Sequence, residues 1–552
     1  MRHGGQILAD QLKIHGARRV FSVPGESFLA ALDGLYESGI DNVVCRQEGG
    51  AAMMAEAYGK LTGQPGICFV TRGPGATNAS AGVHIAMQDS TPMILFIGQI
   101  DRGHRDREVF QEVDYRAMFG PLAKWVAEID STDRIPEYIR RAFAVATAGR
   151  PGPVVLALPE DMLSDSADVP DSPGPLVELT PTYSTIAEDA LDWLAQAEKP
   201  LVVVGGPHWS PQAAADLAQF ASTQNVPVAL GFRRQDYLDN RHPCYAGDLN
   251  VGPNPRLAAR LRDADRLLVI GSRLGDIETQ GFTNVDPIRQ KPRICHIHAD
   301  PNELGRVWAP DLCAVADAVN FTRALSRLPA CRTDWADWTR SARADYDAWL
   351  TPKESPGAVK QEEVIRHLSL TLPEDAILTN GAGNYAAWLH RYFVYKGFRT
   401  QLAPTSGSMG YGFPAAVSAS LEHPDRVVVC LAGDGCLQMT LNEMSTAIQY
   451  GAKPIVIVMN NGRYGTIRMH QEKHYPGRVS GTMLANPDFA ELVRAYGGHG
   501  ETVEVQDQFA AAFDRAQAAG TLAVIEVKID PEALSTGMTL SEARAAGEAA
   551  KG

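Results

Sequence analysis

The chain has 552 residues, of which 45% are apolar and 21% charged, so it is too long for one hydrophobic core and is neither disordered nor fibrous in composition. Its 51 basic and 65 acidic residues give a formal charge of −14, which disfavours nucleic acid and anionic membranes as partners. The longest apolar runs have the length of strands, so we expect no membrane segment.

The N-terminus and the cysteines both predict a cytoplasmic protein. The opening "MRHGGQILADQLKIHG" lacks the apolar segment of a signal peptide. The eight cysteines form no C-x-x-C pair, and several lie inside apolar runs, as small core residues do. We therefore expect free thiols in a reducing compartment.

One pattern recurs along the chain: a short apolar run, a Gly-rich turn and a longer amphipathic stretch. Such runs without polar alternation are typical of parallel strands covered by helices on both faces. We therefore predict an α/β protein built from doubly wound parallel sheets. In chain order the runs are "GICFVTRGPGATN", "PMILFIGQI", "PVVLALPEDM", "PLVVVGG", "RLLVIGS", "RVVVCLAGDG" and "PIVIVMNNG".

Two segments rich in Pro, Ser and Asp predict linkers between domains. They are "SDSADVPDSPGPLVELTPTYS" (164–184) and "LTPKESPGAV" (350–359). They divide the chain into three domains of ordinary size, which we expect at residues 1–165, 185–335 and 355–535. The tail "SEARAAGEAAKG" is expected to be a weak, solvated helix or a frayed end.

Two polar motifs each end an apolar run near the C-terminus. Gly433-Asp434-Gly435 and Asn460-Asn461-Gly462 have 24 residues between them, including "TLNEMSTAIQYG", which we expect to be a crossover helix. Neighbouring parallel strands would then place Asp434 and Asn461 at one sheet edge. A carboxylate, a carboxamide and a backbone carbonyl suit Mg²⁺ bound to phosphate, and the N–H groups of residues 435–437 could bind that phosphate. Singly, Asp434 could instead be a helix cap and Asn461 a turn residue.

This pair of motifs resembles the thiamine-diphosphate signature of the decarboxylase and carboligase superfamily. Residues 46–100, "RQEGGAAMM…FIGQI", are similar to the N-terminal pyrimidine-binding domain of acetolactate synthases and their relatives. "GRPGPVVLALPEDM" resembles the closing strand of that domain, and "TSGSMGYGFPAA" resembles the turn that receives the aminopyrimidine. The resemblance covers nearly all of residues 1–530. It implies a pyrimidine-binding, a central and a diphosphate-binding domain, in that order.

The resemblance also implies roles for individual residues. Glu48 would be the catalytic carboxyl group that hydrogen-bonds the pyrimidine; otherwise it is an ordinary acid at a helix start. The Mg²⁺ ligands would be the side chains of Asp434 and Asn461 and the carbonyl of Arg463. Gly407 would accept from the pyrimidine amino group and Met409 would support the cofactor, although an ordinary core Met is the alternative. The cofactor-binding set is Gly383, Asn384, Gly407, Met409, Gly433, Gly435, Cys436, Asn461, Tyr464, Gly465 and Thr466.

The substrate is left open, because the chain departs from the family where substrate should bind. Biosynthetic acetolactate synthases have Gln-Trp-Gln where this chain has Met469-His470-Gln471, and they have no charge at the positions of Glu26 and Arg72. His470 and His474 stand four residues apart, but no carboxylate motif accompanies them, so a substrate-facing or solvated role is expected. The candidate substrate residues are Gly25, Glu26, Arg72, Phe110, Gln111, Lys124 and His470.

The expected function is therefore decarboxylation of a 2-oxo acid with carboligation to a second carbonyl compound, using thiamine diphosphate and Mg²⁺. In the family, the residues matching Glu48 and Asp434 come from different subunits, so a homodimer or homotetramer is expected. "GSRLGD" and "CHIHADP" in the central domain leave FAD or a CoA ester open. With the same cofactor, the alternatives are a 2-hydroxyacyl-CoA or oxalyl-CoA lyase and a C–C hydrolase. From another class, they are a non-catalytic binding protein and a nicotinamide-dependent dehydrogenase.

Overall fold

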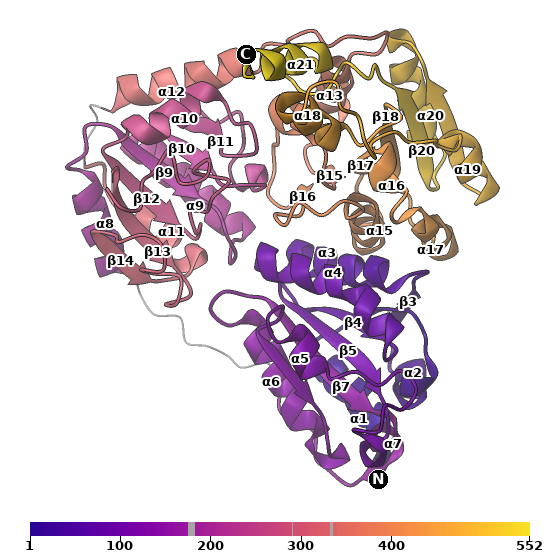
Figure 1. Ribbon diagram of the computed structural model, residues 1–552. Helices are drawn as coiled ribbons and strands as arrows, with labels where there is room; N and C mark the ends of the chain where they lie inside the picture. Colours follow the sequence, from indigo (N-terminus) through magenta and orange to yellow (C-terminus); the bar gives the residue numbers. More distant parts are fainter. Residues whose placement is uncertain (175–182, 290, 332–334, 552) are drawn as a thin grey trace.

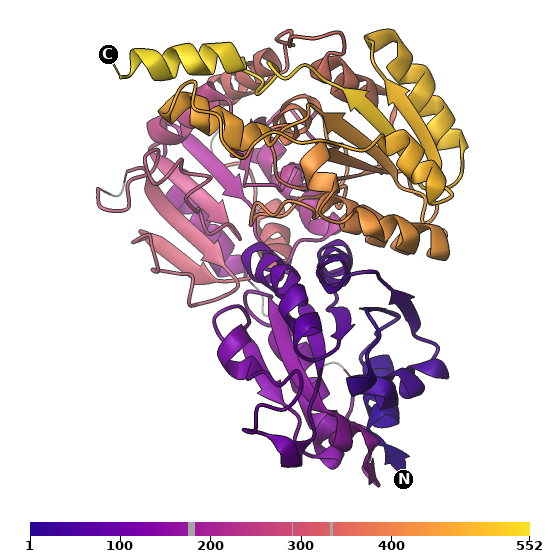
Figure 2. The ribbon, with the colours of Figure 1, turned by 45° about the vertical axis from the view of Figure 1, so that its right-hand side comes forward.

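The protein consists of three lobes, each built around its own six-stranded parallel sheet (Figures 1 and 2). The structure is a computed structural model and describes residues 1–174, 183–289, 291–331 and 335–551. It confirms the predicted α/β class of doubly wound parallel sheets. Within the described residues, no helix is both long enough and apolar enough to cross a bilayer.

The N-terminal lobe has the strand order β3-β2-β4-β5-β7-β6. Strands β4, β5 and β7 are buried along their whole length, which explains why their sequences show no polar alternation. The strands are β1 (Arg2–His3), β2 (Arg19–Ser22), β3 (Asp41–Val44), β4 (Gly66–Val70), β5 (Met93–Gln99), β6 (Trp125–Glu128), β7 (Pro153–Pro159) and β8 (Ser166–Ala167). The helices are α1 (Gly4–Ile14), α2 (Leu29–Tyr36), α3 (Glu48–Thr62), α4 (Pro74–Asp89), α5 (Tyr115–Phe119), α6 (Ile135–Thr147) and α7 (Glu160–Ser164).

The central lobe has the order β11-β10-β9-β12-β13-β14, which is that of a dinucleotide-binding domain. Its strands are β9 (Pro200–Val204), β10 (Val228–Leu230), β11 (Tyr245–Asp248), β12 (Arg266–Ile270), β13 (Arg293–His298) and β14 (Leu312–Val315). Its helices are α8 (Ser184–Leu194), α9 (Pro211–Gln224), α10 (Pro255–Asp263), α11 (Ala318–Ser326) and α12 (Ala336–Trp349).

The C-terminal lobe has the order β16-β15-β17-β18-β20-β19. Its strands are β15 (Ile377–Asn380), β16 (Gln401–Leu402), β17 (Val428–Gly433), β18 (Ile455–Asn460), β19 (His499–Val503) and β20 (Ala523–Lys528). Its helices are α13 (Gln361–Thr371), α14 (Ala386–Tyr392), α15 (Gly412–Glu422), α16 (Asp434–Leu437), α17 (Met444–Tyr450), α18 (Gly465–His474), α19 (Phe489–Ala495), α20 (Phe509–Ala518) and α21 (Leu540–Ala549).

Helices α3 and α4 join the N-terminal lobe to the C-terminal lobe. Figure 1 shows them above the N-terminal sheet, facing α15 and α17. Buried residues of α3 and α15 belong to one apolar core that both lobes share. The small residues of α3 allow close packing: a side chain at Gly50 would overlap the carboxylate of Glu443. This joint therefore fixes α3 against the C-terminal lobe.

Each lobe extends beyond the boundary that we predicted for it. Strand β8 pairs with β1, so the N-terminal lobe continues past residue 165. Helix α12 packs against β11 and α10, so the central lobe continues past residue 335. Helix α21 packs against α18 in the C-terminal lobe. The tail forms a helix, as one of the two predicted alternatives stated, and most of its residues are exposed. It is not a frayed end, because Arg544 of α21 pairs with the fully buried carboxylate of Glu472.

The predicted crossover helix between the two polar motifs is interrupted. The segment after β17 forms the short helix α16, a 3₁₀ turn at Leu441–Glu443 and then α17. The turn lets the Glu443 carboxylate accept hydrogen bonds from the backbone N–H groups of Arg46 and Gln47 at the start of α3. This 3₁₀ turn therefore places Glu443 where it links the C-terminal lobe to the start of α3.

Candidate active site

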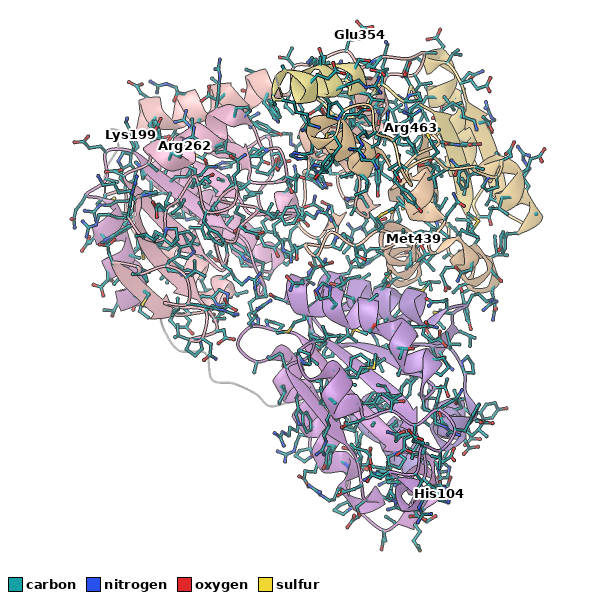
Figure 3. The ribbon with its side chains drawn as sticks, viewed as in Figure 1. His104, Lys199, Arg262, Glu354, Met439 and Arg463 are labelled. Atoms are coloured by element: carbon teal, nitrogen blue, oxygen red, sulfur yellow. The ribbon has the colours of Figure 1, made fainter. Side chains whose placement is uncertain are left out.

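The two polar motifs lie side by side, as the spacing predicted. Strands β17 and β18 are parallel neighbours, with Gly433 opposite Met459. Asp434 and Asn461 follow these strand ends directly, and both line one cavity. Figure 3 labels Arg463, which directly follows the second motif, in the C-terminal lobe. The geometry therefore brings both proposed metal-binding side chains to one sheet edge.

The Asp434 carboxylate is buried and makes three hydrogen bonds. Its Oδ1 accepts from the N–H of Gly435 at 2.9 Å, and its Oδ2 accepts from the N–H of Gly462 at 2.9 Å. The Nδ2 of Asn486 donates to the same Oδ2 at 2.7 Å. Burial raises the pKa of Asp434 above its ordinary value, although these hydrogen bonds act against that shift. The bond from Gly462 joins the two motifs directly.

The two asparagines of the second motif serve different purposes. Asn461 lines the cavity, and its Oδ1 accepts from the N–H of Arg463 at 3.2 Å. Asn460 instead donates its Nδ2 to the buried carboxylate of Glu526 at 2.5 Å. Its Oδ1 accepts from Asn486 at 2.9 Å. Asn460 therefore anchors the loop, while Asn461 remains available to a ligand.

The cavity at these strand ends has a volume of about 250 Å³. Every residue that the sequence proposed for the cofactor or the metal lines it. Its other lining residues are mainly apolar, including Trp388, Met459, Ile467, Ile529 and Leu534. The proposed residues are Gly383, Asn384, Gly407, Met409, Gly433, Asp434, Gly435, Cys436, Asn461, Arg463, Tyr464, Gly465 and Thr466.

Three polar contacts shape the walls of the cavity. The Thr466 hydroxyl donates to Oδ1 of Asn384 at 2.9 Å, joining the starts of α18 and α14. The buried Cys436 thiol lies 3.3 Å from the Tyr385 hydroxyl and 3.1 Å from the N–H of Gly410. Burial raises the pKa of Cys436, so this thiol is a packing group rather than a nucleophile.

Glu48 lies outside this cavity. Its Oε2 accepts from Nδ2 of Asn78 at 3.0 Å, and its Oε1 lies 3.3 Å from the point that a Cβ at Gly75 would occupy. Among the described residues, all those that line the cavity fall within residues 361–534. The structure therefore does not bring Glu48 together with Asp434 within one chain.

A charged group lies near Glu48, at the carboxyl ends of β2, β4 and β7. The Nη1 of Arg72 donates to Oε2 of Glu160 at 2.8 Å, and its Nη2 lies 3.6 Å from Oε1 of Glu26. The Arg72 side chain is 9% exposed, whereas that of Glu26 is 69% exposed. Gly25 packs so closely on Thr71 that a side chain at residue 25 would overlap it.

The candidate substrate residues 110 and 111 border this group. Gln111 packs against Gly73, which follows Arg72 in the chain. Phe110 is 74% exposed, an unusual degree for a large apolar ring. Both residues lie in the loop after β5, on the same side of the lobe as Glu48.

The structure separates the remaining two candidate substrate residues from this group. Lys124 precedes β6 and therefore lies at the amino ends of the strands, where its Nζ donates to the carbonyls of Val145 and Ala148 at 2.5 and 2.7 Å. Its interpretation as a substrate residue beside Glu48 does not fit this place, because it caps the end of α6 instead. His470 is exposed on α18, with its ring stacked on that of His474, and does not line the cavity.

Sequence reasoning missed Asn486 and Glu160. Asn486 holds Asp434 and Asn460 in place from a loop 52 residues beyond Asp434, and no motif marks it. Glu160 follows β7 directly, so the rule that ligands bind beyond the carboxyl ends of parallel strands could have indicated it.

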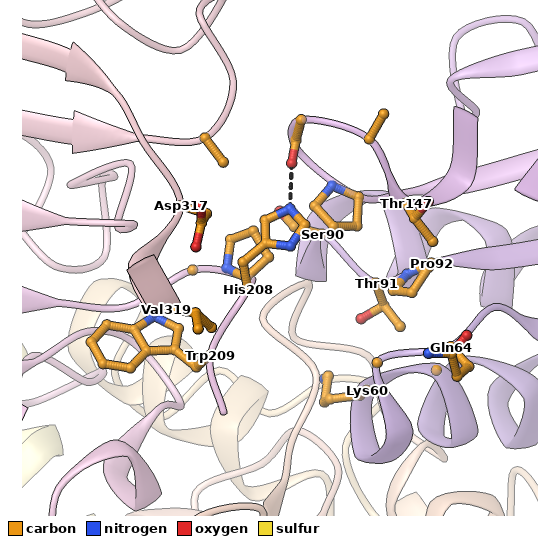
Figure 4. A pocket seen from close by; sticks show the side chains of 18 of the residues that line it. Lys60, Gln64, Ser90, Thr91, Pro92, Thr147, His208, Trp209, Asp317 and Val319 are labelled. Atoms are coloured by element: carbon orange, nitrogen blue, oxygen red, sulfur yellow. Dashed lines mark hydrogen bonds between the residues drawn. The ribbon is translucent and has the colours of Figure 1, made fainter. Parts of the chain in front are cut away.

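A larger cavity, of about 860 Å³, lies among the three lobes and contains none of the predicted site residues. Figure 4 shows Lys60, Ser90, His208 and Asp317 around it, with a hydrogen bond of 2.6 Å between His208 and the carbonyl of Gly149.

Comparison with known proteins agrees with this geometry. Residues 2–118 match the N-terminal TPP binding domain of thiamine pyrophosphate enzymes, residues 187–325 the central domain, and residues 381–527 the C-terminal TPP binding domain. The chain is 30% identical to the acetolactate synthase isozyme 2 large subunit of Escherichia coli over 93% of each chain. It is 32% identical to the acetolactate synthase large subunit of Corynebacterium glutamicum, over 90% of this chain and 81% of that one.

These matches span the three lobes in the order in which the chain builds them, and the C-terminal match contains both polar motifs. The chain therefore belongs to the family of thiamine-pyrophosphate-dependent enzymes and is of the acetolactate synthase type.

Proposed function

We propose that this thiamine-pyrophosphate-dependent enzyme decarboxylates a 2-oxo acid and joins the remaining acyl unit to a second carbonyl compound. In this proposal Mg²⁺ and the diphosphate of the cofactor bind in the cavity of the C-terminal lobe. Glu48 of a second copy of the chain completes the site. The observation that carries the proposal is the convergence of Asp434 and Asn461 in one cavity with all the other proposed cofactor residues.

The oxygen atoms around Asp434 fit one metal ion that also binds phosphate. A carboxylate offers about four lone-pair positions, and Asp434 uses three of them for hydrogen bonds within the protein. Asn461 uses one of the two positions on its Oδ1. The described residues contain no group of three or more His, Cys, Asp or Glu that could hold a metal. A site with a single carboxylate suits Mg²⁺, which completes its shell with phosphate and water oxygens.

The cavity also fits a group with a polar and an apolar part. Gly407 has a positive φ of 68°, and a Cβ there would meet no atom within 4 Å, so the backbone turn faces open space. Three buried polar atoms on lining residues have no partner: Nε1 of Trp388, Oε1 of Gln361 and Nε of Arg463. Apolar side chains supply the remaining wall, as is typical of cofactor sites.

The roles of the chain's own residues follow from their positions. Asp434, Asn461 and the Arg463 carbonyl would hold Mg²⁺, and the Gly407 carbonyl with Met409 would orient the ring end. Glu48 would hold a proton at the pyrimidine nitrogen. When bound, thiamine diphosphate supplies a nucleophilic carbon and an electron sink for breaking the bond beside a carbonyl. The apolar wall would exclude water and strengthen these polar contacts.

The need for a second copy follows from where Glu48 lies. None of the described residues that line the cavity belongs to the N-terminal lobe. Glu48 instead accepts a hydrogen bond from Asn78 of its own lobe. We therefore propose a homodimer or homotetramer in which the cavity of each chain faces the edge of the N-terminal sheet that carries Glu48 in another copy. The exposed ring of Phe110 lies on that edge and would be covered in the assembly.

We propose that the substrate contacts the charged group around Arg72. Arg72 pairs tightly with Glu160, but its contact with the exposed Glu26 is loose at 3.6 Å. A carboxylate of a 2-oxo acid could therefore replace Glu26 on the guanidinium group, because arginine binds carboxylates in a forked geometry.

For the central lobe we propose that no FAD is held at the strand ends, because a carboxylate of the chain already occupies them. Oε1 of Glu278 accepts from the N–H of Phe232 at 3.1 Å, and its Oε2 accepts from Ser272 at 2.8 Å and from Gly275 at 2.9 Å. A nucleotide diphosphate would need these same donors. Purified enzyme titrated with FAD should show no saturable binding by isothermal titration calorimetry. The variant Glu278→Ala tests whether removal of the carboxylate allows FAD to bind.

Two other sequence predictions remain proposals. Among the described residues, the buried cysteines Cys45, Cys68 and Cys430 lie in the core as thiols, which supports a cytoplasmic location that fractionation of cells tests. The predicted linkers at residues 164–184, of which residues 175–182 lie outside the described residues, and 350–359 predict that limited proteolysis releases fragments cut in those segments.

The test of the proposed function is incubation with a panel of 2-oxo acids, beginning with pyruvate, in the presence of thiamine diphosphate and Mg²⁺. Release of CO₂ together with a condensed product such as acetolactate, identified by mass, is the expected result. Cofactor binding without CO₂ release would favour a lyase acting on 2-hydroxyacyl-CoA or oxalyl-CoA, or a C–C hydrolase. Absence of cofactor binding would contradict the proposal.

A further inference from the structure

The turn that carries Gly407 and Met409 is held at both ends by the N-terminal lobe of the same chain. At one end, the N–H of Thr405 donates to Oδ1 of Asp89 at 2.5 Å, and the Thr405 hydroxyl donates to the same oxygen. At the other end, the Tyr411 hydroxyl donates to Oε2 of Glu56 at 2.6 Å. Glu56 lies on α3 and Asp89 ends α4.

Lys60, one turn after Glu56 on α3, links the two acids. Its Nζ donates to Oδ2 of Asp89 and lies 3.4 Å from Oε1 of Glu56. It also donates to the carbonyl of Ala403, just before the turn, at 3.0 Å. Figure 4 shows Lys60 between the helix of the N-terminal lobe and the paler ribbon of the C-terminal lobe. We call Glu56, Lys60 and Asp89 the clamp.

The clamp is buried and its hydrogen bonds are nearly complete. The side chains of Glu56 and Asp89 are 0% exposed and that of Lys60 is 10% exposed. Thr91 donates to the remaining oxygen of Glu56 at 2.7 Å. Buried ion pairs add little net stability because removing charges from water costs as much as pairing them returns. A buried group of this kind does fix geometry, because its bonds are directional and expensive to leave unmade.

We infer that Glu56, Lys60 and Asp89 are positioning residues that fix the turn of Gly407 and Met409 against helix α3, and so set the place of the cofactor's pyrimidine end. This inference rests on the proposed function. Helix α3 begins at Glu48, which serves the cavity of another copy, while its later turns hold the turn of its own chain. One helix therefore connects two active sites of the assembly.

Two binding measurements separate the clamp from the diphosphate site. Isothermal titration calorimetry of the Mg²⁺-loaded protein gives one dissociation constant for thiamine diphosphate and another for inorganic pyrophosphate. Pyrophosphate reaches only the Asp434 end of the cavity. Tyr411→Phe removes the clamp bond at one end of the turn, and Thr405→Val removes the hydroxyl bond at the other.

Each variant should weaken thiamine diphosphate binding about tenfold, the effect of one lost hydrogen bond to a charged group, and leave pyrophosphate binding within about twofold. The matched control is Tyr450→Phe. The Tyr450 hydroxyl also joins the two lobes, by bonds of 2.8 Å to Val44 and 3.1 Å to Asn42, but it does not touch the turn. This control should keep both constants.

The outcomes are distinct. Unchanged thiamine diphosphate affinity in both turn variants would overturn the inference. An equal loss in Tyr450→Phe would also overturn it, because the effect would then belong to the joint as a whole. A wild-type protein that binds neither ligand would instead contradict the proposed function, before any variant is compared.

Discussion

The N-terminal and C-terminal sheets have the same topology but carry different chemistry. Numbered in chain order within each six-stranded sheet, the strands of both run 2-1-3-4-6-5. In the C-terminal sheet the third and fourth strands, β17 and β18, are followed by Asp434 and Asn461. In the N-terminal sheet the corresponding strands, β4 and β5, are followed by Thr71 and Ile100. Both lobes therefore have a sheet edge of the same topology, and the residues that directly follow the strands determine which ligands that edge can bind.

In the proposed assembly, each of these two edges would supply one half of an active site. The C-terminal edge offers oxygen atoms that could bind a metal, whereas the N-terminal edge has Glu48 and the ion pairs of Arg72. The central sheet is a third case, since Glu278 occupies its strand ends. Variants at the first two edges test whether the C-terminal edge binds the cofactor and the metal while the N-terminal edge supplies Glu48 and contacts the substrate.

The largest effect is expected for Asp434→Ala. Loss of the only carboxylate among the proposed metal ligands should lower activity by more than about a thousandfold and abolish Mg²⁺-dependent cofactor binding. Isothermal titration calorimetry with thiamine diphosphate, with and without EDTA, measures this. The corresponding substitution in the N-terminal sheet, Thr71→Ala, should leave cofactor affinity intact. A similar loss of affinity in Thr71→Ala would contradict the proposal that only the C-terminal edge binds the metal.

Glu48→Gln should lower activity by about 10²- to 10⁴-fold, the usual contribution of a group that holds or moves a proton. Cofactor affinity should stay within about threefold, because the Asp434 end of the cavity is unchanged and the glutamine side chain can still hydrogen-bond the pyrimidine. Steady-state kinetics and calorimetry together check both values. Glu363→Gln, which changes a partly exposed acid in the first turn of α13, is the matched control for an ordinary helix-start acid.

Asn486→Ala should weaken Mg²⁺ binding about 10- to 100-fold, the usual cost of losing a residue that holds a metal ligand in place. Its amide donates to both Asp434 and Asn460, so the carboxylate would lose its orientation. A Mg²⁺ titration of activity at saturating cofactor measures the change. Asn302→Ala, in the central lobe, is the control, and an unchanged titration in Asn486→Ala would exclude the role.

The smallest effect is expected for Arg72→Met, a roughly tenfold rise in KM for the 2-oxo acid with cofactor affinity unchanged. The reason is that Arg72 lies at the N-terminal edge and not in the cavity. Arg134→Met removes a guanidinium whose ion pairs are exposed and serves as the control. A change in cofactor affinity without a change in KM would contradict this role and would indicate that Arg72 contacts the cofactor instead of the substrate.

The fold was predictable because its signals are local. Continuous apolar runs such as that of β18 belong to strands buried on both faces, whatever the rest of the chain does. The candidate cofactor residues also lie within a few positions of strand ends, so parallel topology alone brings them to one edge. The motif spacing predicted that Asp434 and Asn461 would meet, and the family resemblance implied the other residues that line the same cavity.

Long-range contacts were not predictable. Asn486 reaches Asp434 from a loop without any motif, and Glu278 fills the central strand ends from 6 residues beyond Ser272. The resemblance of its neighbourhood to a substrate channel does not reveal that Lys124 stands before β6 rather than after it. The tail folds because Gly547 leaves room for the backbone of Glu472, which its own sequence does not reveal.

The most direct test of the central claim is complementation between two inactive variants, Glu48→Gln and Asp434→Ala. Neither forms an active site alone. If each site combines Asp434 of one copy with Glu48 of another, equal co-expression should restore about a quarter of wild-type specific activity, because half the dimers are mixed and each has one intact site. If both residues serve a site within one chain, mixed assemblies would stay inactive, and that result would contradict the account.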